Sequence, residues 1–481
     1  MLVTIIRKEI LENILSYRFP LFLVIVVLLI PTSLYVNYLE YEKRVADYGE
    51  QVRLADETLR SSRLMDIHMG TIPLNGFRSP APLAVFANGF ENSLPRYYEF
   101  QPNGVKEGET SVGDETVLSI LGKFDFLFIV QMVVSLIVLL FASDLVAGEK
   151  ELGTLRGMLS NSVARPTILL AKLLGGFIAV WLPSVIAFLL GMIVLSATSF
   201  PLLAGTTFLR VLLIFAATSL FILTYFTLGL MVSANAARTR SALVATLLFW
   251  IVLQLVIPKV SGMVAAVVYP VRTETVISMQ KSMITKTLDE EKAKLLGREY
   301  ERIFGRGAPL TTDPTPRPGL DEWNAIKTDT DKRSRERKSE QLRQVEGAHR
   351  REKHVQQTIA STLSLLSPGA AFTRLITDLC ATGEIDNEKY RDAVSSHQQT
   401  LDAALFSHVS KTTLIFPGGG SASSSSIGEM VDLKTLPTFS MGRATVYEAL
   451  DANWGSILSI AFWLILTFAL AHVRFLRYDV R

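Results

Sequence analysis

The chain contains little cysteine, histidine or charge. Its 481 residues include one cysteine and six histidines, and only 19% are charged, against roughly 25% in soluble domains. A disulfide within the chain is excluded, so Cys380 is either a free thiol or bridged to a second copy. So few soft ligands argue against a dedicated zinc site. The low charge argues against a wholly soluble protein.

Catalytic and nucleotide-binding motifs are missing as well. The sequence has no G-x-x-x-x-G-K-[ST] phosphate loop and no G-x-G-x-x-G loop after a strand. It has neither a G-x-S-x-G nucleophile elbow nor an H-E-x-x-H zinc helix. We therefore expect no ATP site in this chain, and we assign it no catalytic residue, no metal ligand and no cofactor.

The chain has instead long apolar runs between dense charged blocks. Hydrophobic residues make up 49% of the sequence, and a run of about 20 apolar residues is long enough to cross a bilayer. We predict an all-α integral membrane protein with six transmembrane helices: the first at 21–38, the second at 126–147, the third to fifth within 173–260, and the sixth at 454–473. A cleaved signal peptide is the alternative for the first run, disfavoured because the leading region is long and no A-x-A-like site follows.

Basic residues in the short loops predict which side each segment faces. They follow the second and fourth spans and flank both termini, and cytoplasmic loops are enriched in lysine and arginine. The predicted cytoplasmic parts are an amphipathic helix at 1–20, the segment 148–172 and a tail at 474–481, so both termini are cytoplasmic. The basic residues concerned are Arg7, Lys8, Lys150, Arg156, Arg165, Lys172, Arg238, Arg240, Arg474, Arg477 and Arg481.

This topology places two long polar segments, 39–125 and 271–453, outside the cytoplasm. Long loops are exempt from the charge rule, so their many basic residues do not contradict it. We predict one mainly helical external domain made of both segments. The second segment has helix-like runs at 275–304 and 320–366, which we expect to form a helical hairpin. The glycine- and serine-rich stretch 418–426 predicts a mobile loop.

The most informative cytoplasmic segment is 148–172, which reads GEKELGTLRGMLSNSVARPTILLAK. Leucines recur at helical spacing, and two glycines four residues apart allow close approach of a partner's backbone. The pattern favours a short helix that lies along the membrane and packs into a groove of a partner. The residues that carry it are Leu152, Gly153, Leu155, Gly157, Met158 and Leu159.

This segment resembles the ABC type-2 permease family, whose members read approximately G-E-x-E-x-G-T-L-x-x-L-L-S-x-P-x-x-R-x-x-x-x-x-x-K at this point. Val163 departs from the proline neighbourhood of the family. The six spans and the cytoplasmic termini also fit, and the resemblance covers the membrane part, a little under half of the chain. The matching residues are Gly148, Glu149, Glu151, Gly153, Thr154, Leu155, Met158, Leu159, Ser160, Arg165 and Lys172.

The resemblance implies a function and its partners. The segment would dock on a separate ATPase subunit that binds ATP and magnesium, and the chain would pair with a second copy in a bacterial inner membrane. Such a permease would move a substrate across or out of the bilayer. The docking residues that the resemblance implies are Glu149, Glu151, Gly153, Thr154, Leu155, Met158, Leu159 and Arg165.

A second resemblance lies at 366–383, which reads LSPGAAFTRLITDLCATG. It resembles a subgroup of these permeases with a large external insertion, related to the copper-cluster maturation permease of nitrous oxide reductase. The alternative is an ordinary capped amphipathic helix, since Ser367 and Pro368 are typical of a helix start and Leu375 and Leu379 share one face. The sequence leaves both interpretations open.

Polar residues inside the predicted spans have two interpretations. They either line a cavity for the substrate or form hydrogen bonds between neighbouring helices. The residues concerned are Gln131, Ser135, Thr224, Thr227 and Gln254. Asp144, near the end of the second span, is expected to brace the cytoplasmic segment.

Two further patterns favour ordinary roles. Met65, His68 and Met69 share a helix face and suit Cu(I) chemically, but packing is the commoner role of methionine. The charged run 329–353 mixes acidic and basic residues without aromatics. A solvated helix face is therefore favoured over nucleic-acid binding.

Together these features predict the permease subunit of an ABC exporter. Its external domain would receive the substrate or pass it to a partner in the periplasm or at the cell surface. The rival is a membrane scaffold or sensor, which requires no ATPase and therefore no segment like 148–172. A membrane-embedded enzyme is disfavoured because no paired carboxylates or metal cluster fall at membrane depth.

Overall fold

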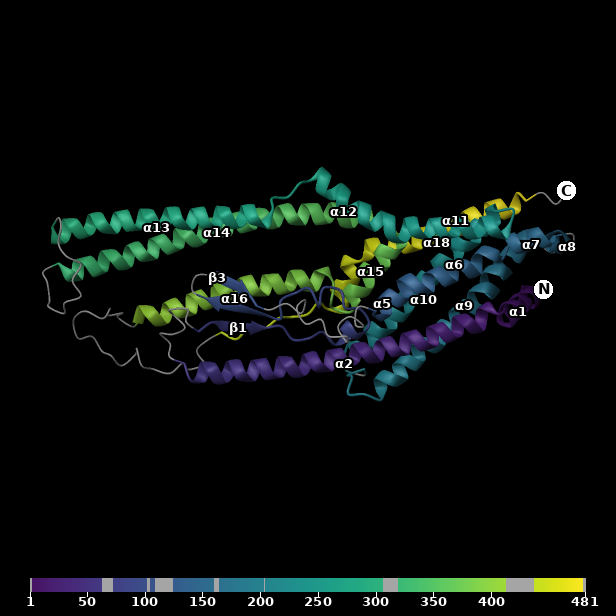
Figure 1. Cartoon of the computed structure of the whole chain (residues 1–481), viewed down its shortest axis with the longest axis horizontal. Helices are drawn as coiled ribbons and strands as arrows, with labels where there is room; N and C mark the ends of the chain where they lie inside the picture. The colour runs from purple at the N-terminus through teal and green to yellow at the C-terminus, as the bar shows by residue number, and fades with distance from the viewer. Residues whose placement is uncertain are drawn as a thin grey trace.

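The computed structural model describes residues 2–62, 72–101, 104–108, 124–159, 164–202, 204–305, 319–411 and 437–478. Six helices in this part of the chain are long and apolar enough to cross a membrane, which confirms the predicted mainly helical, six-span fold. They are α2 (Arg18–Arg60), the composite Phe126–Leu152, α9 (Arg165–Ser196), α10 (Thr207–Asn235), the composite Thr239–Val268 and α18 (Trp454–Leu476). Both termini lie at one end of this bundle (Figure 1).

The two composite spans each contain a π-helical turn. The second span consists of α5 (Phe126–Phe128), η3 (Ile129–Val134), α6 (Ser135–Asp144) and α7 (Ala147–Leu152). The fifth consists of α11 (Thr239–Ile251), η4 (Val252–Val256) and α12 (Ile257–Val268). In both, η marks the π-helical turn. Such turns are rare and occur frequently at functional sites.

The N-terminal region forms two helices, α1 (Leu2–Leu15) and α2. α1 packs on α9. α2 continues well past residue 38, where the first span was predicted to end, although Pro31 lies inside it. An ion pair one helical turn apart, between Arg44 and Glu40 at 3.1 Å, supports its outer part. Hydropathy does not register such pairs, so the sequence predicted the apolar span at 21–38 but not the continuation of its helix to Arg60.

The external domain includes a small sheet that the sequence analysis did not predict. β1 (Leu74–Phe77), β2 (Tyr97–Gln101) and β3 (Gly104–Glu107) pair antiparallel in the order β1-β2-β3. Strands of four or five residues are too short for their alternation to be read from sequence. The sheet packs on α16 (Glu384–Lys411), and Phe100 and Tyr390 share one core. Both long segments therefore contribute to the same domain.

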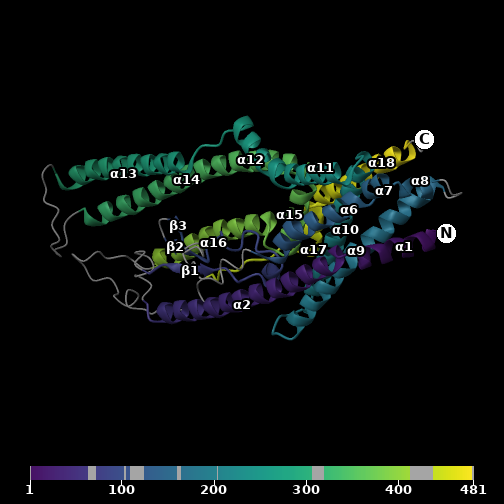
Figure 2. The same ribbon diagram turned by 45° about the vertical axis from the view of Figure 1, so that its right-hand side comes forward.

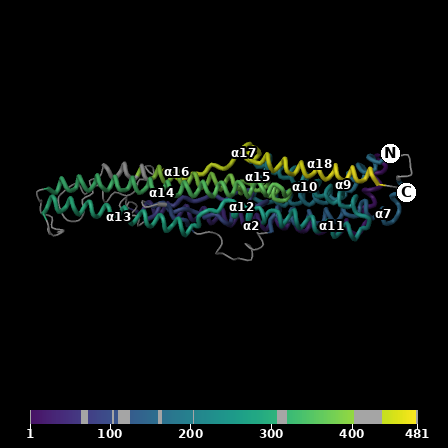
Figure 3. The backbone as a smooth tube through the Cα atoms, turned by 90° about the horizontal axis from the view of Figure 1, so that it is seen from above, coloured from purple at the N-terminus to yellow at the C-terminus, as the bar shows by residue number. Residues whose placement is uncertain are grey.

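A long helical hairpin extends away from the spans (Figures 1 and 2). α13 (Glu274–Phe304) and α14 (Leu320–Ser364) pack side by side, with bounds within two residues of those expected. α13 ends at Gly305, whose φ of +88° is open to glycine. Seen from above, the hairpin continues the long axis of a narrow molecule (Figure 3).

The chain after the hairpin includes a helix that packs against the spans, a contact that the sequence analysis did not predict for the segment 271–453. α15 (Pro368–Leu379) returns to the spans and packs against α10, α18, η3 and η4. One interpretation of the sequence was an ordinary capped amphipathic helix. In the structure, the apolar face of this helix is covered by the bundle. α17 (Val446–Ala452) then leads into α18.

Candidate functional site

The predicted docking segment forms two short helices at the end of the bundle where both termini lie (Figure 1). α7 and α8 (Thr154–Leu159) are separated by Gly153. Gly153 has φ +74°, a left-handed conformation that ends a helix and that glycine adopts without steric cost. The segment is therefore a bent pair of helices rather than one continuous helix.

The bend decides which predicted docking residues are exposed. Glu151, Leu152 and Thr154 are exposed, and Leu152 reaches 79%. Leu155 is fully buried in the core of the bundle. The prediction that its side chain meets a partner is therefore corrected. Leu152 and Leu155 would share a face of one continuous helix, but Gly153 interrupts that helix and leaves Leu152 as the exposed apolar side chain.

A buried cluster of three charges lies beneath the bend. Lys172 is 1% exposed, and its Nζ lies 2.9 Å from Glu9 Oε1 and 2.7 Å from Glu149 Oε1. Gly175 permits this approach, since a β-carbon there would lie 2.6 Å from the Cβ of Glu9. Glu149, predicted to dock, thus faces Lys172. Because buried charges persist only when paired, this Lys172 triad fixes α1 and α7 to α9.

Hydrogen bonds from α10 hold the start of the segment. Ser233 Oγ accepts from the N–H groups of Val146 at 3.0 Å and Ala147 at 2.9 Å. Lys150 Nζ donates to the carbonyl of Ala236 at 3.1 Å. These hydrogen bonds attach the segment to the end of the fourth span, in addition to the second span, of which α7 is the continuation.

Asp144 links the segment to two further spans. It forms an ion pair with Arg18 at 3.1 Å and accepts from Thr239 Oγ1 at 3.1 Å. Glu151 in turn accepts from the N–H of Thr239 at 2.9 Å. Arg18 begins α2 and Thr239 begins α11, so Asp144 connects the first, second and fifth spans at the docking end.

The remaining predicted docking residues have separate contacts. Arg165 donates to the carbonyls of Leu476 at 2.6 Å and Tyr478 at 3.0 Å, which ties α9 to the end of α18. Met158 is half-buried against the core, and α8 ends at Leu159. The predicted loop at 418–426 lies outside the described part of the chain, as do six residues singled out in the sequence: Met65, His68, Met69, Ser160, Val163 and Arg481.

A second polar cluster lies where α15 meets the two π-helical turns. Thr373 Oγ1 donates to Gln131 Oε1 at 2.8 Å, and Gln254 Nε2 donates to the carbonyl of Gln131 at 3.2 Å. Tyr225 donates to Gln254 Oε1 at 2.5 Å. Gly369 permits this packing, because a β-carbon there would collide with the Gln254 amide. This network joins α15 to the second, fourth and fifth spans.

The other polar residues predicted in the spans also make helix contacts. Ser135 Oγ accepts from Trp250 Nε1 at 2.9 Å. Thr227 Oγ1 lies 2.9 Å from Thr467 Oγ1 on α18, and Thr224 bonds within its own helix. Of the two interpretations, these contacts favour hydrogen bonding between helices.

A cavity inside the bundle is too small for a substrate. Its volume is about 10 Å³, and Ile30, Phe126 and Trp181 are among its lining residues. This is space for about one water molecule. None of the five polar residues predicted to line a cavity borders it.

An aromatic contact and a hydrogen bond to the backbone also hold α15 against α10. Phe372 stacks on Phe221 of α10, with ring centroids 4.1 Å apart and an interplanar angle of 15°. Arg210, also on α10, is 7% exposed and donates to the carbonyl of Leu379 at 2.7 Å. α15 is therefore an integral part of the bundle at the end opposite to α7 and α8.

A comparison with protein families matches residues 3–480 to the family described as ABC-2 family transporter protein. The chain belongs to the ABC-2 transporter family. It is a multi-pass membrane permease of an ABC transporter, and its family implies an ABC ATPase subunit as partner. The match extends through the external domain, beyond the membrane part that carried the resemblance. No individual curated protein gives a significant match.

Two parts of the candidate site of this ABC-2 permease escaped sequence reasoning. Glu9, a charged residue of the N-terminal helix that was predicted to be amphipathic at 1–20, is 2% exposed and paired with Lys172. The insertion of α15 was also missed. Its sequence signal was the S-P-G start at 367–369, in which a helix cap is followed by a residue small enough for close packing.

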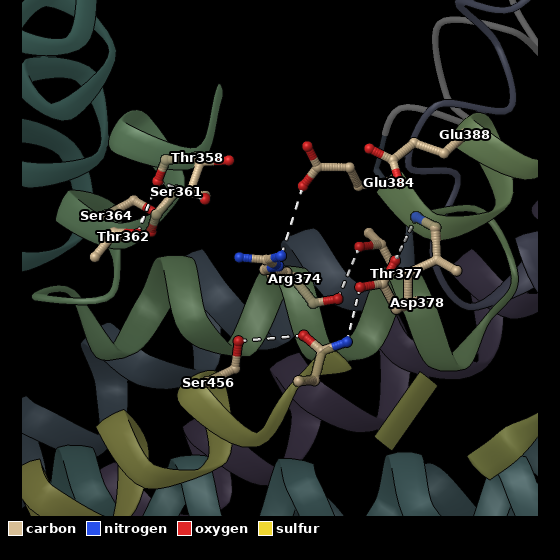
Figure 4. A network of polar contacts seen from close by, with 12 residues as sticks. Thr358, Ser361, Thr362, Ser364, Arg374, Thr377, Asp378, Glu384, Glu388 and Ser456 are labelled. Carbon is tan, nitrogen blue, oxygen red and sulfur yellow. Dashed lines mark hydrogen bonds and ion pairs between the residues drawn. The ribbon is translucent and has the colours of Figure 1, made fainter. Parts of the chain in front are cut away.

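The outer end of α15 in this permease is a buried polar junction (Figure 4). Arg374 Nη2 lies 3.8 Å from Glu384 Oε2, at the start of α16. Asp378 accepts from Asn453 Nδ2 at 2.7 Å, and Ser456 donates to Asn453 Oδ1 at 3.2 Å. Burial raises the pKa of Asp378 to about 6. The junction between α15, α16 and α18 should therefore respond to pH.

Acidification is expected to stabilise this junction. The pKa of Asp378 is about 6 in the folded chain and about 4 in the unfolded chain. A carboxyl with a raised folded pKa lowers the free energy of unfolding as pH rises from the unfolded to the folded pKa, here from about 4 to about 6. Between about pH 7 and pH 4 the wild type should gain about 2 kcal/mol more unfolding free energy than Asp378→Asn, which does not titrate. Thermal unfolding of both proteins in detergent measures this difference. Equal pH slopes would contradict the prediction.

Proposed function

We propose that this permease is the membrane subunit of an ABC exporter in a bacterial inner membrane, with α7, α8 and both termini in the cytoplasm. Two copies pair, and each docks one ATPase subunit, which binds ATP and magnesium, at the bend around Gly153. The external domain receives the substrate or passes it to a partner in the periplasm or at the cell surface. We also propose that the chain belongs to the subgroup of these permeases that has a large external insertion and is related to the nitrous oxide reductase maturation permease, because 366–383 resembles that subgroup.

The exposed bend at 151–154 carries the proposal. It presents an apolar side chain, Leu152, between the carboxylate of Glu151 and the hydroxyl of Thr154. An exposed apolar anchor with a polar surround is the composition of a contact that docks into a partner's groove. The Lys172 triad supports the bend from beneath, so force applied to it passes to α1 and α9.

A route from the docking end to the outer end supports coupling. One span, Phe126–Leu152, carries α7 at one end and Gln131 at the other. Gln131 contacts Thr373 of α15. Displacement of this span by the ATPase therefore shifts α15 against Gln254. Because α15 contacts the spans through Gln131 and Gln254, repacking of these contacts is the proposed step that admits the substrate.

Leu152→Glu tests the docking surface. The ATPase recovered with the purified permease should fall at least about tenfold, since a charge at an apolar anchor costs about 1.4 kcal/mol or more. Native mass spectrometry of the complex, extracted gently from its own membrane, measures the stoichiometry. Val3→Glu is the matched control, because Val3 is 76% exposed at the same end of the molecule but lies on α1.

Recovery of the ATPase separates the exporter proposal from its alternative, a membrane scaffold or sensor. Wild-type amounts of ATPase on Leu152→Glu would show that the docking assignment is wrong. If the wild type recovers no ATPase even with an ATP analogue, the membrane scaffold or sensor becomes the favoured function.

A further inference from the structure

The α13–α14 hairpin has too little core of its own. Among the 31 residues of α13 and the 45 of α14, all described, only Ile277, Leu288 and His349 are buried. Helices in proteins draw most of their stability from packing an amphipathic face. A hairpin of this length with three buried side chains leaves most of that face unused.

Ion pairs supply much of the contact between the two helices. Lys281 pairs with Glu346 and Lys292 pairs with Asp331 at 2.7 Å. A further pair lies toward the tip, between Arg302 and Glu322 at 2.9 Å. Each is at least partly exposed to solvent, and exposed pairs contribute little to stability. They do set the register, which places residues near 291 of α13 level with residues near 335 of α14.

An apolar stripe and a groove lie side by side on the hairpin. Val276, Met279 and Met283 follow one another at helical spacing and are 49%, 58% and 64% exposed. Met283 also borders a groove of about 750 Å³. The groove is lined by Met283, Ile284, Thr287, Leu288 and Glu291 of α13, and by Glu336, Arg337, Glu340, Gln341 and Gln344 of α14. One wall is thus mainly apolar and the other polar.

Three charged side chains that border the groove have no ion partner among the described residues: Glu291, Glu336 and Arg337. Glu291 and Arg337 both line it, and neither pairs with any residue in the part of the chain that the structure describes. Because the helices are in register, the two side chains lie at the same height. Under a two-fold rotation, Arg337 of one copy can face Glu291 of the other at this height, which gives opposite charges on the facing surfaces.

The membrane fixes how a second copy would approach. The stripe begins beyond Val268, where the fifth span ends, so lipid tails do not cover it. Two copies in one bilayer have the same orientation, so their two-fold axis runs along the membrane normal and both hairpins project to the same side. In such an isologous contact, surfaces of equal height meet.

We infer that the hairpin groove docks the hairpin of a second copy, forming a four-helix bundle outside the membrane. In it, Arg337 of each copy pairs with Glu291 of the other, and the stripe around Met283 is buried against the facing helix. This inference rests on the proposed pairing of two permease copies. It adds the surface outside the bilayer through which they recognise each other.

Cysteine cross-linking in the full-length permease, in native membrane vesicles, tests this contact. Met283→Cys treated with a short bis-maleimide should yield a covalent dimer, whereas Ser282→Cys, exposed but about 100° around the helix, should not. Cys380 is fully buried, so the wild type provides an unreactive background.

Charge reversal then tests the pairing itself. In the Met283→Cys background, Glu291→Arg or Arg337→Glu should each reduce the cross-linked dimer at least about fivefold. The double reversal should restore it, because opposite charges again face each other. A loss of folding would reduce the single and double variants alike, so restoration distinguishes the contact from misfolding.

The remaining outcomes separate this inference from the proposed function. If native mass spectrometry finds two permease copies in the complex but Met283→Cys forms no dimer, the hairpin contact is wrong and the exporter proposal stands. A cross-link to a different protein also overturns it, since another partner then occupies the groove. A complex with a single permease copy overturns both the pairing and the contact.

Discussion

Lys172→Met is expected to lower the free energy of unfolding by about 3–5 kcal/mol, because it leaves two buried carboxylates without their cation. Glu9 and Glu149 both contact Lys172 Nζ, from α1 and α7. Their repulsion would loosen the helices that hold the docking bend, so recovery of the ATPase should fall together with stability. Thermal unfolding in detergent measures the first effect, and native mass spectrometry measures the second.

Neutralising the whole cluster should reverse most of this loss. The triple variant Glu9→Gln, Glu149→Gln, Lys172→Met removes all three charges, and replacing an entire buried ion cluster by neutral groups is often tolerated. Lys8→Met, which removes an exposed pair with Glu12, should change stability by no more than about 0.5 kcal/mol. A Lys172→Met protein as stable as wild type would mean that the Lys172 triad does not hold α1 and α7 to α9.

Phe372→Ala is expected to cost about 3–5 kcal/mol, the usual loss on truncating a buried aromatic side chain. Phe372 is fully buried and stacks on Phe221, so its loss leaves a cavity between α15 and α10. α15 lies at the end of the bundle opposite to the docking bend. Thermal unfolding should therefore show a large loss, while the ATPase recovered below the unfolding temperature stays near the wild-type amount.

Phe90→Ala is the matched control for this variant. Phe90 is 43% exposed, so its truncation should change stability by about 0.5 kcal/mol or less. Loss of ATPase recovery in Phe372→Ala at a temperature where the protein is folded would contradict the separation of the two ends. It would mean that α15 also determines the shape of the docking bend.

The spans could be predicted because the bilayer imposes a simple rule on sequence. A helix that crosses it needs about 20 apolar residues and satisfies its backbone internally. No such rule fixes the length of a helix outside the bilayer, so the continuation of α2 to Arg60 could not be read from hydropathy. The strands of the external sheet were too short to be predicted from alternation in the sequence, and they depend on α16 for their core.

The candidate site could be located from sequence but not oriented. The pattern at 148–172 predicted a docking segment, which the structure shows as two short helices, yet a single left-handed residue, Gly153, decides which leucine is exposed. The buried contacts escaped because they join distant positions. Lys172 and Glu9 are 163 residues apart, and Thr373 and Gln131 are 242 apart. Pairings of this kind depend on the tertiary fold, which local periodicity does not encode.

Pro31 gives the long helix α2 two mechanically distinct halves. A proline inside a helix removes one backbone hydrogen bond and is the usual site of a kink. The inner half is anchored through the Arg18–Asp144 pair, whereas the outer half contacts β1 and the external domain. If α2 bends at this position, the outer half and the strand that it contacts should move relative to the docking end. Such bending would displace the external domain as a whole, without any change in its internal packing.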